Sequence, residues 1–203
     1  MEKYEFTGET MKRDGIILRR IRALRAIDLK SGSKEKQVKK GDLGGWLEKE
    51  DNLDQCSDAW VYGDAWVSGD AWVSGDAWVS GDARVFSNAV VSGNARVSGD
   101  AFIFREDHWL TIGAVGSRND FVTFFRNQAG EILVKCGCFY GTVDAFLKKV
   151  QQTHGDSKHA AVYRVCVEAA RAQIDTTPYK EPLEEIVAGR MTGAAGCDCG
   201  GVR

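Results

Sequence analysis

The sequence predicts a mainly β protein: a parallel β-helix of six-residue repeats, followed by a small α+β module. Three observations predict this architecture. The chain repeats hexads such as Ala-Trp-Val-Ser-Gly-Asp from residue 59 to residue 106, and a period of six fits short strands joined by turns rather than an α-helix. The 203 residues include 23 glycines and only 2 prolines, which indicates many tight turns. After Phe104 the repeat stops, and strand and helix patterns alternate with turns.

Two apolar columns run through the repeat. Within a hexad the alanine and the valine are two residues apart, so both side chains point to one face of a short strand, and the residue between them points to the other. The Gly-Asp pair then turns the corner. The first column holds Ala59, Ala65, Ala71, Ala77, Ala83, Ala89, Ala95 and Ala101, and the second holds Val61, Val67, Val73, Val79, Val85, Val91, Val97 and Ile103. Two degenerate hexads, 47–52 and 53–58, are placed in the same register, with Leu47 and Leu53 in the alanine column.

The repeat resembles the hexapeptide family of left-handed β-helices. In Val61-Tyr62-Gly63-Asp64-Ala65-Trp66 an aliphatic residue is followed, four positions on, by a small one, which is the spacing of that family. The resemblance implies a left-handed solenoid in which three hexads close one triangular coil, and it implies assembly as a trimer. Residues eighteen apart then stack at about the 4.7–4.9 Å spacing of neighbouring strands.

The outward residues of the repeat are mostly aromatic or basic. The three-hexad coil places Trp60, Trp78 and Arg96 on one side, Trp66, Arg84 and Phe102 on the second, and Trp72 and Val90 on the third. One interpretation is an interface with sister subunits or another protein, because three apolar sides are hard for one chain to cover. The alternative is that the N- and C-terminal segments of the same chain cover them. The interface prediction comprises Trp60, Trp66, Trp72, Trp78, Arg84, Arg96 and Phe102.

Composition excludes several classes of protein. The formal net charge of -2 and the pI of about 6.0 argue against direct nucleic-acid binding. No apolar run approaches the roughly 18 residues of a membrane helix, and the N-terminus has no apolar stretch of the kind found in signal peptides. We therefore expect a cytoplasmic protein without a membrane partner, whose six cysteines are thiols or metal ligands rather than disulfides.

The patterns divide the chain into four segments. Residues 1–46 form a basic cap for the lower end of the β-helix, with an amphipathic strand or hairpin over 16–27. Residues 47–106 form the β-helix, and residues 107–177 form the α+β module. Residues 178–203 form a flexible tail with a short helix at 183–190.

Within the α+β module the sequence predicts three strands and two helices. The strands are 108–113, 121–125 and 132–138. Thr142 is expected to cap a helix over 143–152, and Ser157 a second helix that runs to Ile174. Helical spacing predicts the buried face of the second helix as Ala161, Val162, Val165, Ala169 and Ala172.

Four phrases extend the resemblance beyond the repeat. They are Gly-Asp-Leu-Gly-Gly-Trp at 41–46, Gly-Asp-Ala-Trp at 63–66, Thr-Ile-Gly with Gly-Ser-Arg over 111–118, and Cys-Gly-Cys-Phe-Tyr-Gly-Thr at 136–142. Because it contains these four phrases, the chain resembles phage- and prophage-encoded hexapeptide-repeat proteins. The resemblance covers about residues 4–174. The resemblance implies a small phage-type protein that acts on host defences, and it transfers no catalytic residue.

Eight residues of the module are of types that hold an anion or stack on a base. Arginine offers a bidentate fork, a helix N-terminus offers unpaired N–H groups, and an aromatic ring offers a stacking face. The predicted residues for a phosphate or nucleotide ligand are Trp109, Ser117, Arg118, Asn119, Lys135, Tyr140, Thr142 and His154. A local explanation also exists: Arg118 and Asn119 form a β-turn, Thr142 caps its helix, and Lys135 is solvated.

Two further chemistries have less support from spacing. Cys136, Cys138, His154 and His159 offer zinc ligands, but two cysteines on one face of a strand also suit packing. The hexapeptide resemblance includes acyltransferases with a histidine base between subunits, whereas the repeat of this chain contains no histidine. We therefore expect neither a cofactor nor catalysis.

The sequence thus predicts a non-enzymatic interaction protein that self-associates and binds a partner. That partner is either a host protein, which the chain masks, or a small anionic nucleotide messenger, which it sequesters. The alternatives are a phage structural or assembly component and an acyltransferase-like enzyme.

Overall fold

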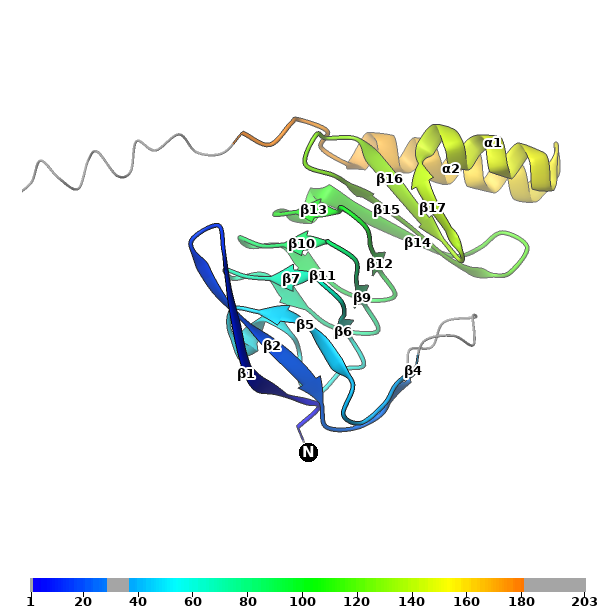
Figure 1. The fold of residues 1–203 in the computed structure, drawn as a ribbon. Helices are drawn as coiled ribbons and strands as arrows, with labels where there is room; N and C mark the ends of the chain where they lie inside the picture. The colour runs from blue at the N-terminus through cyan, green and yellow to red at the C-terminus, as the bar shows by residue number, and fades with distance from the viewer. Residues whose placement is uncertain (1, 29–36, 181–203) are drawn as a thin grey trace, which may run out of the picture.

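Stacked coils of short strands dominate the fold. The computed structural model describes residues 2–28 and 37–180, and Figure 1 shows their arrangement. The coils form a parallel β-solenoid of about 3 turns. Strands of the N-terminal segment lie at its lower end, and a four-stranded sheet with two helices lies at its upper end (Figure 1). The predicted mainly β architecture is therefore confirmed. No helix in the described ranges is long and apolar enough to cross a membrane.

Each hexad contributes one two-residue strand to one of three sides. Strands eighteen residues apart pair in parallel, as predicted: Trp66 pairs with Arg84, and Arg84 pairs with Phe102. The first side contains β7 (Trp66–Val67), β10 (Arg84–Val85) and β13 (Phe102–Ile103), the second contains β6 (Trp60–Val61), β9 (Trp78–Val79) and β12 (Arg96–Val97), and the third contains β8 (Trp72–Val73) and β11 (Val90–Val91).

The predicted alanine and valine columns fill the interior of the solenoid. Every alanine from Ala59 to Ala101 is at most 1% exposed, and every member of the valine column, from Val61 to Ile103, is fully buried. Small and branched side chains therefore alternate along each coil, which lets three strands meet around one narrow core. Glycine turns the corners, and Gly75 and Gly93 both have a positive φ, of 69° and 63°.

These two corner glycines give a matched test of coil stacking. A Cβ on Gly75 would lie 2.8 Å from the Gly93 backbone nitrogen in the next coil, whereas a Cβ on Gly93 would meet nothing within 4 Å. Both alanine substitutions incur the left-handed backbone cost of about 1–2 kcal/mol. Gly75→Ala also forces two coils apart, so we expect it to lower the free energy of unfolding by at least about 1 kcal/mol more than Gly93→Ala. Urea denaturation of the two variants measures the difference, and equal losses would contradict it.

The register predicted for the two degenerate hexads is wrong. Leu47 pairs with Val67, and Leu53 forms a bridge with Val73, so both leucines lie in the valine column rather than in the alanine column. The physical reason is length: Leu53 and Val61 are eight residues apart instead of six, so the first coil is two residues longer. Gly45 takes the place of the alanine, where a Cβ would lie only 2.5 Å from the Ala65 carbonyl oxygen.

The N-terminal segment forms a hairpin that continues one side of the solenoid. Strands β1 (Tyr4–Arg13) and β2 (Ile16–Ala23) pair antiparallel, and β2 pairs with β5 (Leu43–Leu47), which joins β7. A short pair, β3 (Ile27–Asp28) and β4 (Gln37–Val38), and the 3₁₀ turn η1 (Glu50–Asn52) complete the segment. Tyr4, Ile21 and Val38 join the interior core, so this segment closes the lower end.

An antiparallel sheet and two helices follow the solenoid. After the turn η2 (Glu106–His108), the strands β14 (Trp109–Val115), β15 (Asp120–Arg126), β16 (Ile132–Cys136) and β17 (Phe139–Thr142) pair in sequence order. The predicted strand over 132–138 therefore ends early, because Gly137 turns the chain with a φ of 55°. The helices are α1 (Val143–His154) and α2 (Lys158–Gln173), with Thr142 and Ser157 as N-caps, as predicted.

The buried face predicted for α2 is wrong. Val165 is 68% exposed and Val162 is 39% exposed. The buried residues are Ala160, Tyr163, Cys166, Val167 and Ala170. The helix carries two apolar stripes, and the stripe with Tyr163 packs its ring 5.4 Å from Phe146 of α1, which buries more area than the alanines and valines could.

The C-terminal sheet caps each of the three sides of the solenoid at its last coil. On the first side Ala101 bridges to Asn127. On the second, the Arg96 N–H donates to Thr123 Oγ1 at 3.0 Å, and on the third Trp109 Nε1 donates to the Val90 carbonyl at 3.0 Å. Phe125 and Leu133 of the sheet complete the interior core.

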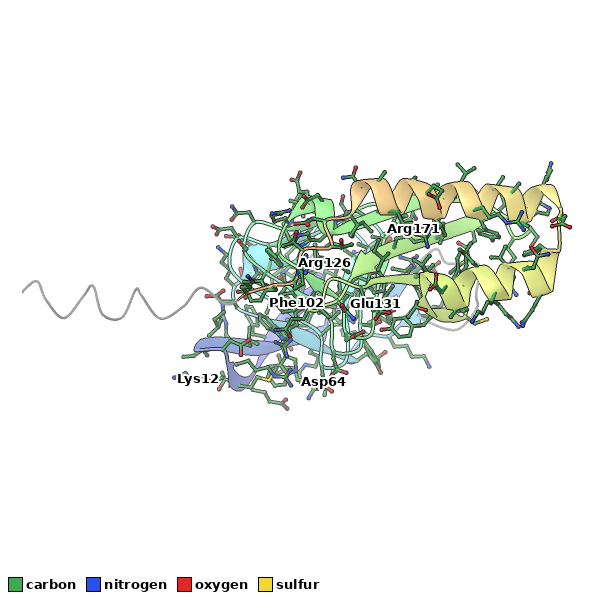
Figure 2. All side chains as sticks on the ribbon, turned by 90° about the horizontal axis from the view of Figure 1, so that it is seen from above. Lys12, Asp64, Phe102, Arg126, Glu131 and Arg171 are labelled. Carbon is green, nitrogen blue, oxygen red and sulfur yellow. The ribbon has the colours of Figure 1, made fainter. Side chains whose placement is uncertain are left out.

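A strap, defined here as residues 174–180, returns from α2 to the last coil. The Asp175 N–H donates to the Asp107 carbonyl at 3.1 Å, and the Tyr179 ring lies 4.9 Å from the Phe102 ring. Figure 2 shows this segment passing Arg126, whose Nη1 donates to the Asp175 carbonyl. The helix predicted at 183–190 and the rest of the predicted tail lie outside the described residues.

Most outward rings of the repeat are covered by the chain itself. Trp60 is fully buried, and Trp66, Trp78 and Phe102 are 2%, 7% and 5% exposed. Leu18 of the hairpin packs on Trp66, and the strap packs on Phe102. These four residues therefore offer no surface to a partner, and self-coverage, the alternative interpretation, holds for them. Trp72 alone among the tryptophans is exposed, at 44%. Arg84 lies 5.9 Å from the rings of Trp66 and Phe102, and Arg96 is half-buried.

Candidate functional site

A cavity of about 180 Å³ opens at the end of the C-terminal module away from the strap. Its lining residues come from the β14–β15 turn, the β16–β17 turn, α1 and the first part of α2. Each turn contains a residue with a positive φ, Asn119 at 52° and Gly137 at 55°, which lets the chain reverse direction sharply. Four separate elements therefore converge on one cavity.

One wall of the cavity carries groups that bind anions. Ser117 and Arg118 come from the β14–β15 turn, and Lys149 and His154 come from the C-terminal part of α1. Neither Arg118 nor Lys149 forms an ion pair with a carboxylate of the described residues. Both cations therefore have free hydrogen-bonding capacity for a ligand.

A row of aromatic rings also lines the cavity. The Phe139 ring lies 5.3 Å from the Phe146 ring, which lies 5.4 Å from the Tyr163 ring. The His154 imidazole lies 5.8 Å from the Tyr163 ring, so it adjoins the aromatic row as well as the anion-binding groups. Phe146 and Tyr163 are buried, whereas Phe139 and His154 are half-buried and border the opening. The arrangement suits a ligand with one anionic end and one flat apolar part.

Two thiols and two further polar groups complete the lining. Burial raises the pKa of the Cys136 thiol, whose Sγ donates to the Tyr163 hydroxyl at 3.9 Å. Burial also raises the pKa of Tyr163 to about 12. The thiol of Cys136 is therefore protonated near neutral pH, and a protonated thiol is a poor nucleophile. Cys138, which is exposed, and Asp120, which accepts from the Phe121 N–H at 2.8 Å, also line the cavity.

The four candidate zinc ligands do not form a metal site. Cys136, Cys138 and His154 all line the cavity, but His159 lies outside it, with its ring 6.0 Å from that of His154. Across residues 2–28 and 37–180, no group of three or more His, Cys, Asp or Glu side chains could hold a metal ion.

Three of the eight predicted ligand-binding residues meet in the cavity: Ser117, Arg118 and His154. The other five do not line it. Trp109 donates to the solenoid backbone, Tyr140 donates to Asp100 Oδ1 at 2.6 Å, and Thr142 Oγ1 accepts from the Ala145 N–H. Asn119 is a turn residue, and Lys135 lies on β16 opposite Thr123 and Tyr140. For Thr142 and Asn119 the local structural explanation given above is the correct one.

Sequence reasoning missed several lining residues, chiefly Lys149, Thr153 and Tyr163. Lys149 and Thr153 are four residues apart on a helix, so they share one face, and His154 follows directly. That spacing was available in the sequence. The contribution of Tyr163 was not, because it depends on which of the two apolar stripes of α2 is buried.

Comparison with known proteins gives no family: no family model matches the chain, and no curated protein matches it.

Proposed function

We propose that the chain is a non-enzymatic binding protein that holds a small anionic ligand in the cavity of its C-terminal module. The observation that carries the proposal is the convergence of Ser117, Arg118, Lys149 and His154 on one cavity. An arginine fork and a lysine ammonium without carboxylate partners are the groups that bind phosphate or carboxylate most strongly. The protonated thiol of Cys136 supports binding rather than nucleophilic catalysis.

Of the two modes expected from the sequence, sequestering an anionic messenger is the one that this cavity supports. Masking a host protein would require exposed apolar surface, and most rings of the solenoid are buried in the chain itself. The phage-type role, the left-handed sense of the coils and self-association are also proposals, which rest on the resemblance of the repeat. Among the residues predicted for the interface, Trp72 has the most exposed aromatic ring, so we propose that self-association would use its side.

A matched pair of lysines tests the proposed anion site. Both Lys149 and the adjacent Lys148 are exposed on α1, but only Lys149 lines the cavity. Isothermal titration of the full chain with inorganic phosphate should give affinity that Lys149→Ala lowers about tenfold, because one charge-assisted hydrogen bond is lost. Lys148→Ala should change the affinity by less than about twofold, because an exposed charge outside the site acts only at long range.

Native mass spectrometry provides a second test that needs no chosen probe. A ligand carried through purification would add mass that denaturation releases, and Lys149→Ala should reduce its occupancy while Lys148→Ala should not. Equal phosphate affinity of the wild type, Lys149→Ala and Arg118→Ala would contradict the proposed site.

A further inference from the structure

The aromatic part of the cavity lining is the feature that the anion proposal leaves unused. Phe139, Phe146 and Tyr163 line the cavity as a continuous row, and the row ends at His154. A free phosphate or carboxylate would use only the polar groups and would leave the half-buried rings of Phe139 and His154 in contact with water. We propose that the ligand is a single planar aromatic ring that bears one anionic group; this inference rests on the proposed function and names its ligand class.

The ring geometry supports a flat ligand part. Neighbouring rings in the row lie 5.3 to 5.8 Å apart, within the range of offset and edge-to-face aromatic contacts. Phe139 and His154, at the two ends of the row, are half-buried and provide the accessible aromatic surface of the cavity. An aromatic ligand ring extends this surface, whatever its ring nitrogens, because every such ring has a π-face.

The size of the cavity restricts the ligand to one ring. Sites that hold drug-sized molecules have volumes of about 300–1,000 Å³, whereas this cavity has about 180 Å³. One aromatic ring and one tetrahedral anion fit such a space, so the ribose of a nucleotide would lie at the opening and a second nucleotide would lie outside the cavity. A sequestered messenger would therefore be bound through one of its units, or would be a mononucleotide.

The charges of the lining restrict the ligand to one anionic group. Arg118 and Lys149 carry the positive charge, and Asp120 places a carboxylate in the same lining. A second anionic group on the ligand would be repelled by Asp120, whereas N–H groups on the edge of a ring could donate to it. Aryl phosphates and mononucleotides share this chemistry.

Titration calorimetry of the full chain with four probes tests the inference. We expect phenyl phosphate and cytidine monophosphate to bind about tenfold tighter than inorganic phosphate, because a stacked ring adds that much affinity. A cyclic dinucleotide should bind no tighter than cytidine monophosphate. Phenyl phosphate represents a phosphorylated aromatic side chain and cytidine monophosphate represents a nucleotide, so the tighter of the two identifies the source of the ligand.

A histidine pair provides the matched variants. His154→Ala should reduce the ratio of phenyl phosphate affinity to phosphate affinity by about fivefold or more, and His154→Phe, which keeps a ring, should retain the ratio. His159→Ala, whose side chain lies outside the cavity, should also retain it. Using the ratio separates loss of the ring contact from a general loss of anion affinity.

The outcomes distinguish this inference from the proposed function. If inorganic phosphate binds as tightly as phenyl phosphate, the ring inference is wrong and the anion site stands. If the cyclic dinucleotide binds tenfold tighter than cytidine monophosphate, the restriction to one ring is wrong. If no probe binds to the wild type, the proposed function is wrong, and the inference falls with it.

Discussion

Trp66→Ala is expected to lower the free energy of unfolding by about 3–5 kcal/mol, and Trp72→Ala by about half as much. The two tryptophans occupy the same position in consecutive, identical Ala-Trp-Val-Ser-Gly-Asp hexads. Trp66 is 2% exposed beneath Leu18 of the N-terminal hairpin, with its ring 6.1 Å from Phe86, whereas Trp72 is 44% exposed. The difference between the two losses therefore measures the stability gained when other parts of the chain cover the ring, since the repeat sequence is the same at both positions.

Urea denaturation followed by circular dichroism measures both losses, since the solenoid backbone reports unfolding independently of the mutated ring. Equal losses for the two variants would contradict the burial difference. The oligomeric mass of Trp72→Ala, compared with that of the wild type, tests self-association separately, because this substitution has the smaller expected effect on the fold.

The second large effect is an acid-sensitive contact at the junction of solenoid and strap. His108 is fully buried, and its Nδ1 accepts from the Phe104 N–H at 3.2 Å. Burial, together with the nearby Arg126 guanidinium, lowers the pKa of His108 to about 4. Arg105 also disfavours the charged imidazole, whereas Asp107 and Asp175 favour it.

The direction of the pH effect follows from these pKa values. Above about pH 6.5 the imidazole is neutral in both the folded and the unfolded chain, so the group contributes no pH dependence. Between about pH 6.5 and pH 4 the unfolded chain binds the proton and the folded chain does not, so stability falls as the pH falls. The expected loss across this window is about 3 kcal/mol.

His108→Gln should remove most of this slope. Denaturation at pH 7 measures the packing cost of the substitution, and denaturation at pH 4.5 then isolates the titration. The carboxylate of Asp175 acts in a lower window, because its pKa is lowered to about 2 mainly by hydrogen bonds from Thr177. An unchanged slope in His108→Gln would show that another group controls the acid response.

The repeat could be predicted well because the direction of each side chain depends only on its neighbours in the sequence. Alanine and valine two residues apart must share a face of a strand, and the eighteen-residue stacking follows from three equal sides. The register of Leu47 and Leu53 could not be obtained in this way, because it depends on where two extra residues are accommodated in the first coil. The buried stripe of α2 depends in the same way on its partner, α1.

In the candidate site, too, the sequence predicts residues of a suitable chemical type but not the residues that helix packing adds. Ser117, Arg118 and His154 could be predicted because their side chains are of types that bind phosphate. Trp109 and Tyr140 were of suitable types, but their polar atoms serve the junction with the solenoid. Lys149 and Tyr163 line the site because α1 and α2 pack together, and no sequence motif links these two residues.

The three contacts that close the last coil also prevent further coils from adding to the upper end of the solenoid. A bare coil end presents backbone N–H and C=O groups to which another coil, or another copy of the chain, can add without limit. Here one such group is already paired on each side. The partners are Asn127 on the first side, the Thr123 hydroxyl on the second and the Trp109 indole on the third. Growth of the upper end by strand addition is therefore blocked chemically as well as sterically, and the stack cannot elongate into a fibre from that end.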